Sequence, residues 1–173
     1  MVLAAVLLSQ TKLRLADGSG QLMPVLGQAR PTVALFVLRD CPISRKYSPE
    51  IQRLIRDYPG VSFRVVLTDP DANPAMARAD AAEFSLHCPV LVDRNRIWAK
   101  ASGVTTVPTA ALFDKSGRLV YRGRIDDRFP ALGVELAQPR RKDLRLALEA
   151  LRTGKPIATD RTPVVGCALP SYF

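Results

Sequence analysis

Residues 33–47 read VALFVLRDCPISRKY, and the predicted fold is built around them. Its first part, Val33 to Leu38, is apolar throughout and predicts a strand that is buried on both faces. Pro42 suits the first turn of a helix, where a missing N–H costs nothing. Apolar residues then recur at helical spacing, so we expect one helix over about 44–58. Cys41 therefore stands at a junction between a strand and a helix.

The position of Cys41 favours chemistry at this residue. At a helix start, a side chain faces unpaired backbone N–H groups and the positive end of the helix dipole. Both stabilise the thiolate, which is the reactive form of cysteine. The alternative is a small core residue, because free cysteines are among the most buried residue types.

The composition indicates one soluble globular domain. Its 173 residues, 47% apolar and 24% charged, are enough for a full hydrophobic core. An excess of 25 Lys and Arg over 16 Asp and Glu gives a net charge of +9, which can attract nucleic acid, anionic lipid or acidic proteins. The basic residues are scattered and no basic strip is interleaved with aromatic residues, so we predict no nucleic-acid role.

The three cysteines, Cys41, Cys88 and Cys167, are too few and too far apart for a disulfide scaffold or a zinc knuckle. One pair and one free thiol is possible, and we predict no metal and no cofactor. The apolar start, residues 1–8, lacks basic residues and is too short to span a bilayer. It is either the stub of a signal segment, which would place the protein in the periplasm or outside the cell and allow membrane association, or a first strand. If Met1 is the true start, we expect a cytoplasmic protein.

The remaining chain predicts alternating strands and helices. A turn at 17–20 between short apolar segments indicates a hairpin at the sheet edge, within an N-terminal extension over residues 1–31. Strand, helix and strand in succession predict a parallel pair with a right-handed crossover, and the turn at 115–117 predicts an antiparallel hairpin. We assign Trp98 to the core. Further strands are expected at 61–68, 89–92, 110–114 and 118–125, and helices at 75–86, 97–102 and 140–151.

Three of these features together resemble the thioredoxin fold over residues 32–151. They are the cysteine at a strand–helix junction, the sequence Val107-Pro108-Thr109 before an antiparallel hairpin, and the closing helix. The added helix and strand between residues 69 and 93 resemble the redoxin branch. The motifs CPIS at 41–44, VYRGRIDDRF at 120–129 and GC at 166–167 are similar to those of bacterial redoxin-domain proteins, usually exported and often described as thiol–disulfide isomerases.

The resemblance implies an α/β, thioredoxin-like three-layer fold with a central mixed β-sheet flanked by helices. The domain would span 32–153, with the redoxin-type insertion inside it and a C-terminal tail over 154–173. Cys41 would be the redox nucleophile, and protein thiols or disulfides would be its partners. Val107-Pro108 would be a cis peptide facing Cys41, and the backbone of Val107 would pair with an extended substrate segment.

The sequence departs from the family at several places. Ser44 stands where thioredoxins carry a second cysteine, and a C-x-x-S site can attack a disulfide but cannot release the mixed disulfide by itself. Leu38 replaces the threonine of peroxiredoxins. Cys41 and His87 fall short of the ligands of copper-delivering relatives, and we expect His87 to have a structural role.

Cys167 is the candidate resolving thiol. The closing helix leads about 18 Å away from the Cys41 edge of the sheet, and the segment 154–166 spans up to about 43 Å when extended. The tail therefore reaches Cys41, and Gly166 would ease a close backbone approach, although reach does not establish a pairing. We expect Cys88 to be buried and inert.

The residues after the last strand, Asp126, Asp127 and Arg128, are expected near Cys41, because that strand and strand 33–38 should finish at one edge of the sheet. The two aspartates would raise the pKa of the thiol, whereas Arg128 and the helix dipole would lower it. A solvated loop with an Arg–Asp pair is the alternative.

Three functions are consistent with this sequence. The first is thiol–disulfide oxidoreduction or isomerisation through Cys41. The second is a non-catalytic binding module or a subunit of a larger assembly, which the missing second cysteine, the acidic neighbours and the long tail favour. The third is a one-cysteine peroxidase.

Overall fold

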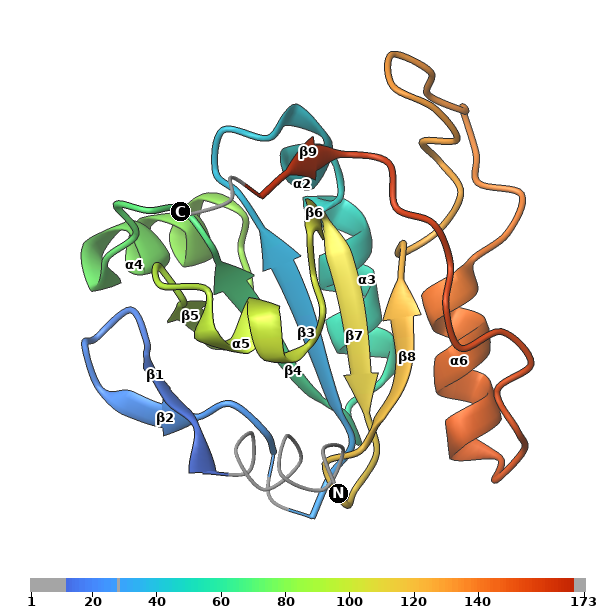
Figure 1. Ribbon diagram of the computed structural model, residues 1–173, viewed down its shortest axis with the longest axis horizontal. Helices are drawn as coiled ribbons and strands as arrows, with labels where there is room; N and C mark the ends of the chain where they lie inside the picture. Colours follow the sequence, from blue (N-terminus) through green and yellow to red (C-terminus); the bar gives the residue numbers. More distant parts are fainter. Residues whose placement is uncertain (1–11, 28, 170–173) are drawn as a thin grey trace.

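The structure is a computed structural model that describes residues 12–27 and 29–169 (Figure 1). The apolar start at residues 1–8 lies outside the described residues. The strands are β1 (Arg14–Ala16), β2 (Leu22–Pro24), β3 (Thr32–Val37), β4 (Ser62–Leu67), β5 (Val90–Val92), β6 (Thr106–Val107), β7 (Thr109–Phe113), β8 (Leu119–Gly123) and β9 (Cys167–Ala168). The helices are α2 (Pro42–Lys46), α3 (Ser48–Asp57), α4 (Pro74–Glu83), α5 (Ile97–Ala101) and α6 (Asp143–Arg152).

A mixed sheet of seven strands forms the centre of the described chain, in the order β2-β1-β5-β4-β3-β7-β8. Strands β3, β4 and β5 run parallel, and β7 and β8 are antiparallel to their neighbours. The β1–β2 hairpin joins the edge at β5, as expected, through Ala16 and Val92. The mixed sheet agrees with the prediction, whereas the domain boundaries at 31/32 and 153/154 stay a prediction.

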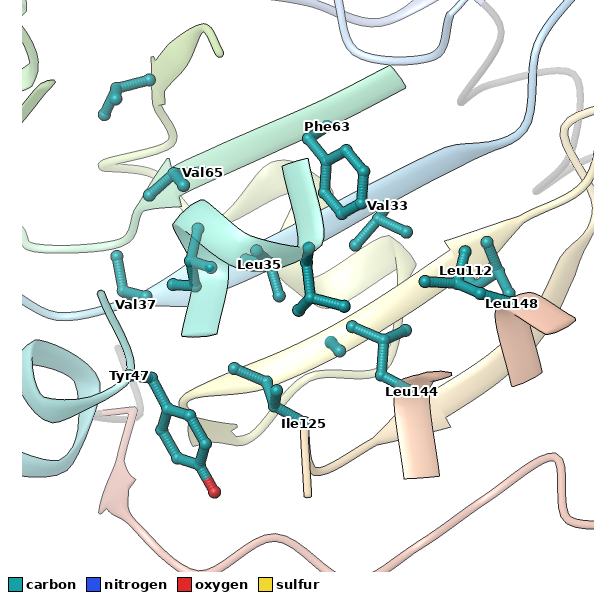
Figure 2. Packing of buried hydrophobic residues seen from close by; sticks show 14 of the residues in the cluster. Val33, Leu35, Val37, Tyr47, Phe63, Val65, Leu112, Ile125, Leu144 and Leu148 are labelled. Atoms are coloured by element: carbon teal, nitrogen blue, oxygen red, sulfur yellow. The ribbon is translucent and has the colours of Figure 1, made fainter. Parts of the chain in front are cut away.

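The helices cover both faces of the sheet, which gives three layers. Alternate residues of β3 point to opposite faces, because side chains on a strand have a period of two. Val33, Leu35 and Val37 pack on one face with α3 and α6 (Figure 2). Ala34 and Phe36 pack on the other face with α5. Every residue of β3 is buried, as the apolar run predicts.

Trp98 of α5 lies at the centre of the second face, with no exposed surface. Its ring stacks on Phe113 at 5.8 Å between centroids and meets the edge of Phe36 at 5.4 Å. Aromatic pairs at these separations stabilise a core beyond the area they bury. Trp98 is a core residue, as predicted.

The single helix predicted over 44–58 is wrong, because the structure has two helices, α2 and α3, that meet at Tyr47. Pro49 has no N–H to donate to the carbonyl oxygen of Arg45, so the helical ladder stops there. The Ser48 hydroxyl donates to that carbonyl instead, at 2.7 Å. The break leaves Tyr47 buried between the two helices and the loop that follows β8. The other predicted helices and strands are present.

The described part of the tail returns from α6 to the far end of the sheet (Figure 1). It first runs parallel to β8, where Arg122 N–H donates to the Asp160 carbonyl at 2.8 Å and Thr162 N–H donates to the Arg122 carbonyl at 3.2 Å. It then forms β9, which pairs antiparallel with β6. No helix within the described ranges is long and apolar enough to cross a membrane.

Candidate active site

A disulfide joins Cys41 to Cys167, although 126 residues separate them in sequence. Their Cα atoms lie 6.0 Å apart, which is within the usual range for a disulfide. Cys41 precedes α2 as its N-cap residue and is only 1% exposed, whereas Cys167 on β9 is partly exposed. The length of the tail showed only that Cys167 could reach Cys41, and the structure shows that the two residues are paired.

The backbone beside the disulfide belongs to β6. The Val107–Pro108 peptide is cis, and the Val107 carbonyl oxygen lies 3.8 Å from Cys41 Sγ. Val107 is also the register partner of Cys167, and Thr106 is that of Ala168. The N–H of Leu169 then donates to the Thr105 carbonyl at 2.8 Å. The cysteine of the tail is thus presented to Cys41 by a short antiparallel ladder.

Gly166 allows this close approach. A Cβ atom at this position would lie 1.9 Å from the Val107 carbonyl oxygen and 2.7 Å from its carbon. Non-bonded carbon and oxygen atoms do not approach this closely, because they repel each other strongly at such distances. The residue before Cys167 must therefore lack a side chain when the ladder is formed.

A network of charges fixes the loop that carries Cys41. Arg39 Nε donates to both carboxylate oxygens of Asp80, at 2.9 and 3.0 Å. Its backbone N–H donates to Asp69 at 3.1 Å. The hydrogen bond to Asp80 raises the pKa of the Arg39 guanidinium, and burial raises the pKa of Asp69. Sequence analysis did not find this network, since its partners lie 30 and 41 residues away and no local pattern links them.

Pro42 and Ser44 of the CPIS motif, both predicted to lie near the Cys41 sulfur, differ in exposure. Pro42 is exposed at the first turn of α2. Ser44 is buried, and its hydroxyl has no hydrogen-bond partner in the part of the chain that the structure describes. A serine cannot form a disulfide, so Cys167 is the residue that closes on Cys41.

Asp126 and Arg128 anchor the loop after β8 against α2 and the α2–α3 junction. Asp126 is buried and accepts hydrogen bonds from the Tyr47 hydroxyl at 2.7 Å and the Arg128 N–H at 2.9 Å. Burial raises the pKa of Asp126, and the Tyr47 hydrogen bond lowers it in part. Arg128 pairs with Glu135, which also pairs with Lys46 of α2.

Asp127 caps a different segment. It accepts from the Arg141 N–H at 2.8 Å. Burial acts to raise its pKa, but the N–H groups of Arg141 and Arg140 outweigh that effect and lower it. These contacts fit structural roles for the three residues, and an influence on the Cys41 thiol stays a prediction.

Cys88 is a free thiol just before β5 and takes no part in this disulfide. The structure meets the prediction of a buried thiol only in part, because Cys88 packs against the core but is partly exposed, and its inertness stays a prediction. Loss of solvation at the sulfur nevertheless raises its pKa to about 11. His87 is exposed. Within the described residues, no group of three or more His, Cys, Asp and Glu is placed to hold a metal ion.

Comparisons with solved structures find proteins of the same architecture. An uncharacterized conserved protein from Geobacillus kaustophilus matches with 28% identity and a TM-score of 0.78, over 92% of this chain and 88% of that one. A hypothetical protein from Sinorhizobium meliloti matches with 25% identity and a TM-score of 0.79, over 91% and 89%. A secreted disulfide oxidoreductase from Mycobacterium tuberculosis, homologous to E. coli DsbE, matches with 18% identity and a TM-score of 0.55, over 64% and 82%.

No protein-family model matches the sequence, and a search of curated proteins gives no match either. The architecture is therefore recognised through structure. The central mixed sheet, the helices on both faces and these neighbours agree with one another. The chain has the thioredoxin-like fold, as the resemblance implied, and it carries a disulfide between the start of α2 and the tail.

Proposed function

We propose that this protein is a thiol–disulfide oxidoreductase in which Cys41 and Cys167 form the redox couple. Protein thiols or disulfides are its substrates. The observation that carries the proposal is the Cys41–Cys167 disulfide itself, set between the N-cap of α2 and a tail strand paired with Val107. The thioredoxin-like neighbours, one of them a secreted disulfide oxidoreductase, support the same chemistry.

In the reducing direction, the Cys41 thiolate attacks one sulfur of a substrate disulfide and expels the other as a thiolate. Cys167 thiolate then attacks Cys41 Sγ, which releases the second substrate thiolate and forms the Cys41–Cys167 disulfide. Two electrons pass from the protein dithiol to the substrate, and two protons complete the substrate thiols. An external dithiol regenerates the couple, and the reverse sequence oxidises a substrate dithiol.

The two cysteines take different roles because their surroundings differ. Cys41 caps a helix, and the unpaired N–H groups there favour its thiolate as nucleophile and leaving group. Cys167 lies on a two-residue strand that can leave β6, so it resolves the mixed disulfide. It supplies the function that Ser44 cannot provide. In this proposal Pro42, Val107 and Pro108 shape the site around the two sulfurs.

We also propose that the protein works in an exported, oxidising compartment. Stable disulfides persist there and are rare in the cytosol. The Mycobacterium tuberculosis neighbour is described as secreted.

A second candidate is a non-catalytic module in which the disulfide is a permanent lock. The burial of Cys41 beneath the tail favours it, because a covered disulfide resists reduction. One-cysteine peroxidase activity stays a prediction.

Reduction of insulin disulfides by dithiothreitol, combined with a glutathione redox titration, separates the two candidates. An oxidoreductase accelerates insulin reduction, loses all turnover as Cys41→Ser, and accumulates one equivalent of mixed disulfide as Cys167→Ser. Cys88→Ser is the matched control and leaves turnover unchanged. A lock shows no turnover in the wild type, and its reduction potential lies below about −300 mV, as for structural disulfides.

A further inference from the structure

The backbone edge of β6 is covered by the chain's own tail. In the described chain, β6 and β9 form a two-stranded sheet apart from the central one. The tail is held there by the pairs Thr106–Ala168 and Val107–Cys167, by the Leu169 hydrogen bond to Thr105, and by the disulfide. Each backbone hydrogen bond contributes only about 1 kcal/mol net, so the disulfide is the principal fastening.

The tail has a separate attachment upstream. Thr162 Oγ1 accepts from the Arg124 N–H at 3.0 Å and lies 2.8 Å from the Tyr121 hydroxyl. A Cβ on Gly123 would lie 2.0 Å from that same oxygen, which shows how closely the tail lies on β8. When the disulfide opens, residues beyond Thr162 are therefore free to leave β6 while the rest of the tail stays in place.

Departure of β9 leaves an unpaired strand edge next to the Cys41 sulfur. Such an edge binds an extended peptide through backbone hydrogen bonds, and the peptide's side chains then give specificity. The resemblance already implies that the backbone of Val107 pairs with an extended substrate segment. Going beyond that expectation, and relying on the proposed function, we propose that Gly166–Leu169 is the internal occupant of this edge and that the edge selects substrate segments of the form Gly-Cys-x-apolar.

Each position of this pattern follows from the contacts of the tail. The substrate cysteine takes the place of Cys167, opposite Val107, because that register brings its sulfur to Cys41. The preceding residue is glycine, because any Cβ there meets the Val107 carbonyl oxygen at 1.9 Å. The position of Ala168 is exposed and accepts any side chain. The position of Leu169 packs against the apolar cluster of α5, so it favours an apolar residue.

The test uses the full chain with Cys88→Ser and Cys167→Ser, so that Cys41 is the only thiol. The probes are peptides of sequence VVGCAL and VVACAL, each with its cysteine carried as a mixed disulfide with 2-thiopyridine. Attack of the Cys41 thiolate on the peptide sulfur forms a Cys41–peptide disulfide and releases pyridine-2-thione, which is followed by absorbance. The symmetric reagent 2,2′-dithiodipyridine measures the intrinsic reactivity of Cys41.

We expect VVGCAL to react at least tenfold faster than VVACAL, and VVGCAS to react more slowly than VVGCAL. Adding Gly166→Ala to the protein loosens the competing tail and should raise the VVGCAL rate further. Equal rates for the glycine and alanine peptides, with normal reaction of dithiodipyridine, would overturn the binding surface and leave the proposed function standing. If dithiodipyridine also fails to react, Cys41 is inaccessible and both proposals are overturned.

Discussion

Replacing Gly166 by alanine should weaken the Cys41–Cys167 disulfide without touching either sulfur. The added Cβ would lie 1.9 Å from the Val107 carbonyl oxygen, 2.7 Å from the Val107 carbon and 3.2 Å from Pro108 Cδ. Two of these three atoms belong to the backbone, which cannot rotate away as a flexible side chain does. Gly166 has no positive φ, so the effect is steric and not a change of backbone preference.

The clash is relieved only if the tail withdraws from β6 by about 1 Å or more. That movement breaks the Val107–Cys167 and Thr106–Ala168 pairing and the Leu169 hydrogen bond to Thr105. At about 1 kcal/mol for each, the ladder is worth about 2–3 kcal/mol. Tenfold corresponds to about 1.4 kcal/mol, so the equilibrium constant for disulfide formation should fall about 30- to 150-fold. For a two-electron couple this raises the reduction potential by about 45–65 mV.

The assay is a glutathione redox titration, with the free thiols trapped by a maleimide that shifts the band on a gel. Gly60→Ala is the matched control, because a Cβ at Gly60 meets no atom within 4 Å. The reduction potential of Gly60→Ala should equal that of the wild type. A Gly166→Ala potential within about 10 mV of the wild type would refute the argument that the β6–β9 ladder sets the strength of the disulfide.

Three further outcomes follow from the same structure. With Cys41 and Cys167 replaced by serine, Cys88 should react with iodoacetamide about 200-fold more slowly at pH 8 than a free cysteine, because the pKa of Cys88 is raised to about 11. The rate is measured by mass spectrometry. Reaction of Cys88 as fast as that of glutathione would contradict the raised pKa. Burial raises the pKa of Asp126 above its unfolded value, so ionisation of Asp126 costs folding free energy as the pH rises. Asp126→Asn removes that cost, and the stability of the variant relative to wild type in urea unfolding should increase from pH 4 to pH 7; a flat or falling difference would be evidence against the raised pKa. Tyr47→Phe removes the 2.7 Å hydrogen bond to Asp126 and should lower the free energy of unfolding by about 1–3 kcal/mol. The control is Leu132→Ala, which should leave the free energy of unfolding almost unchanged because Leu132 is exposed.

Local patterns were sufficient to predict the centre of the fold. The apolar run of β3 and the proline after Cys41 act over a few residues, so a strand followed by a helix start can be predicted without tertiary information. The sequence also contained a signal for the helix break at Tyr47, because Pro49 has no N–H to donate to the Arg45 carbonyl. That signal was present in the sequence and was outweighed by the helical spacing of the apolar residues.

The surroundings of the site depend on partners far away in the chain. Arg39 is fixed by Asp69 and Asp80, and nothing in the sequence around any of the three indicates the pairing. Strand β9 has only two residues, so its conformation is defined by β6 and not by its own propensity. Tail length showed that Cys167 can reach Cys41, but only the position of β6 beside Cys41 shows why it arrives as a strand.

The tail attachment at Thr162 explains how cysteines 126 residues apart could act as the proposed redox couple. In a C-x-x-C site both cysteines belong to one helix. Here the relevant tether is the short segment from Thr162 to Cys167, because Thr162 stays bonded to Tyr121 and Arg124 of the β8 region. A short flexible tether gives an effective concentration in the millimolar range, so under the proposed function Cys167 would outcompete free thiols for a mixed disulfide on Cys41. The same tether would make the tail a competitor of every incoming substrate. On the proposed specificity, only a segment that fits the β6 edge as closely as Gly166-Cys167 does would displace the tail before the disulfide closes again.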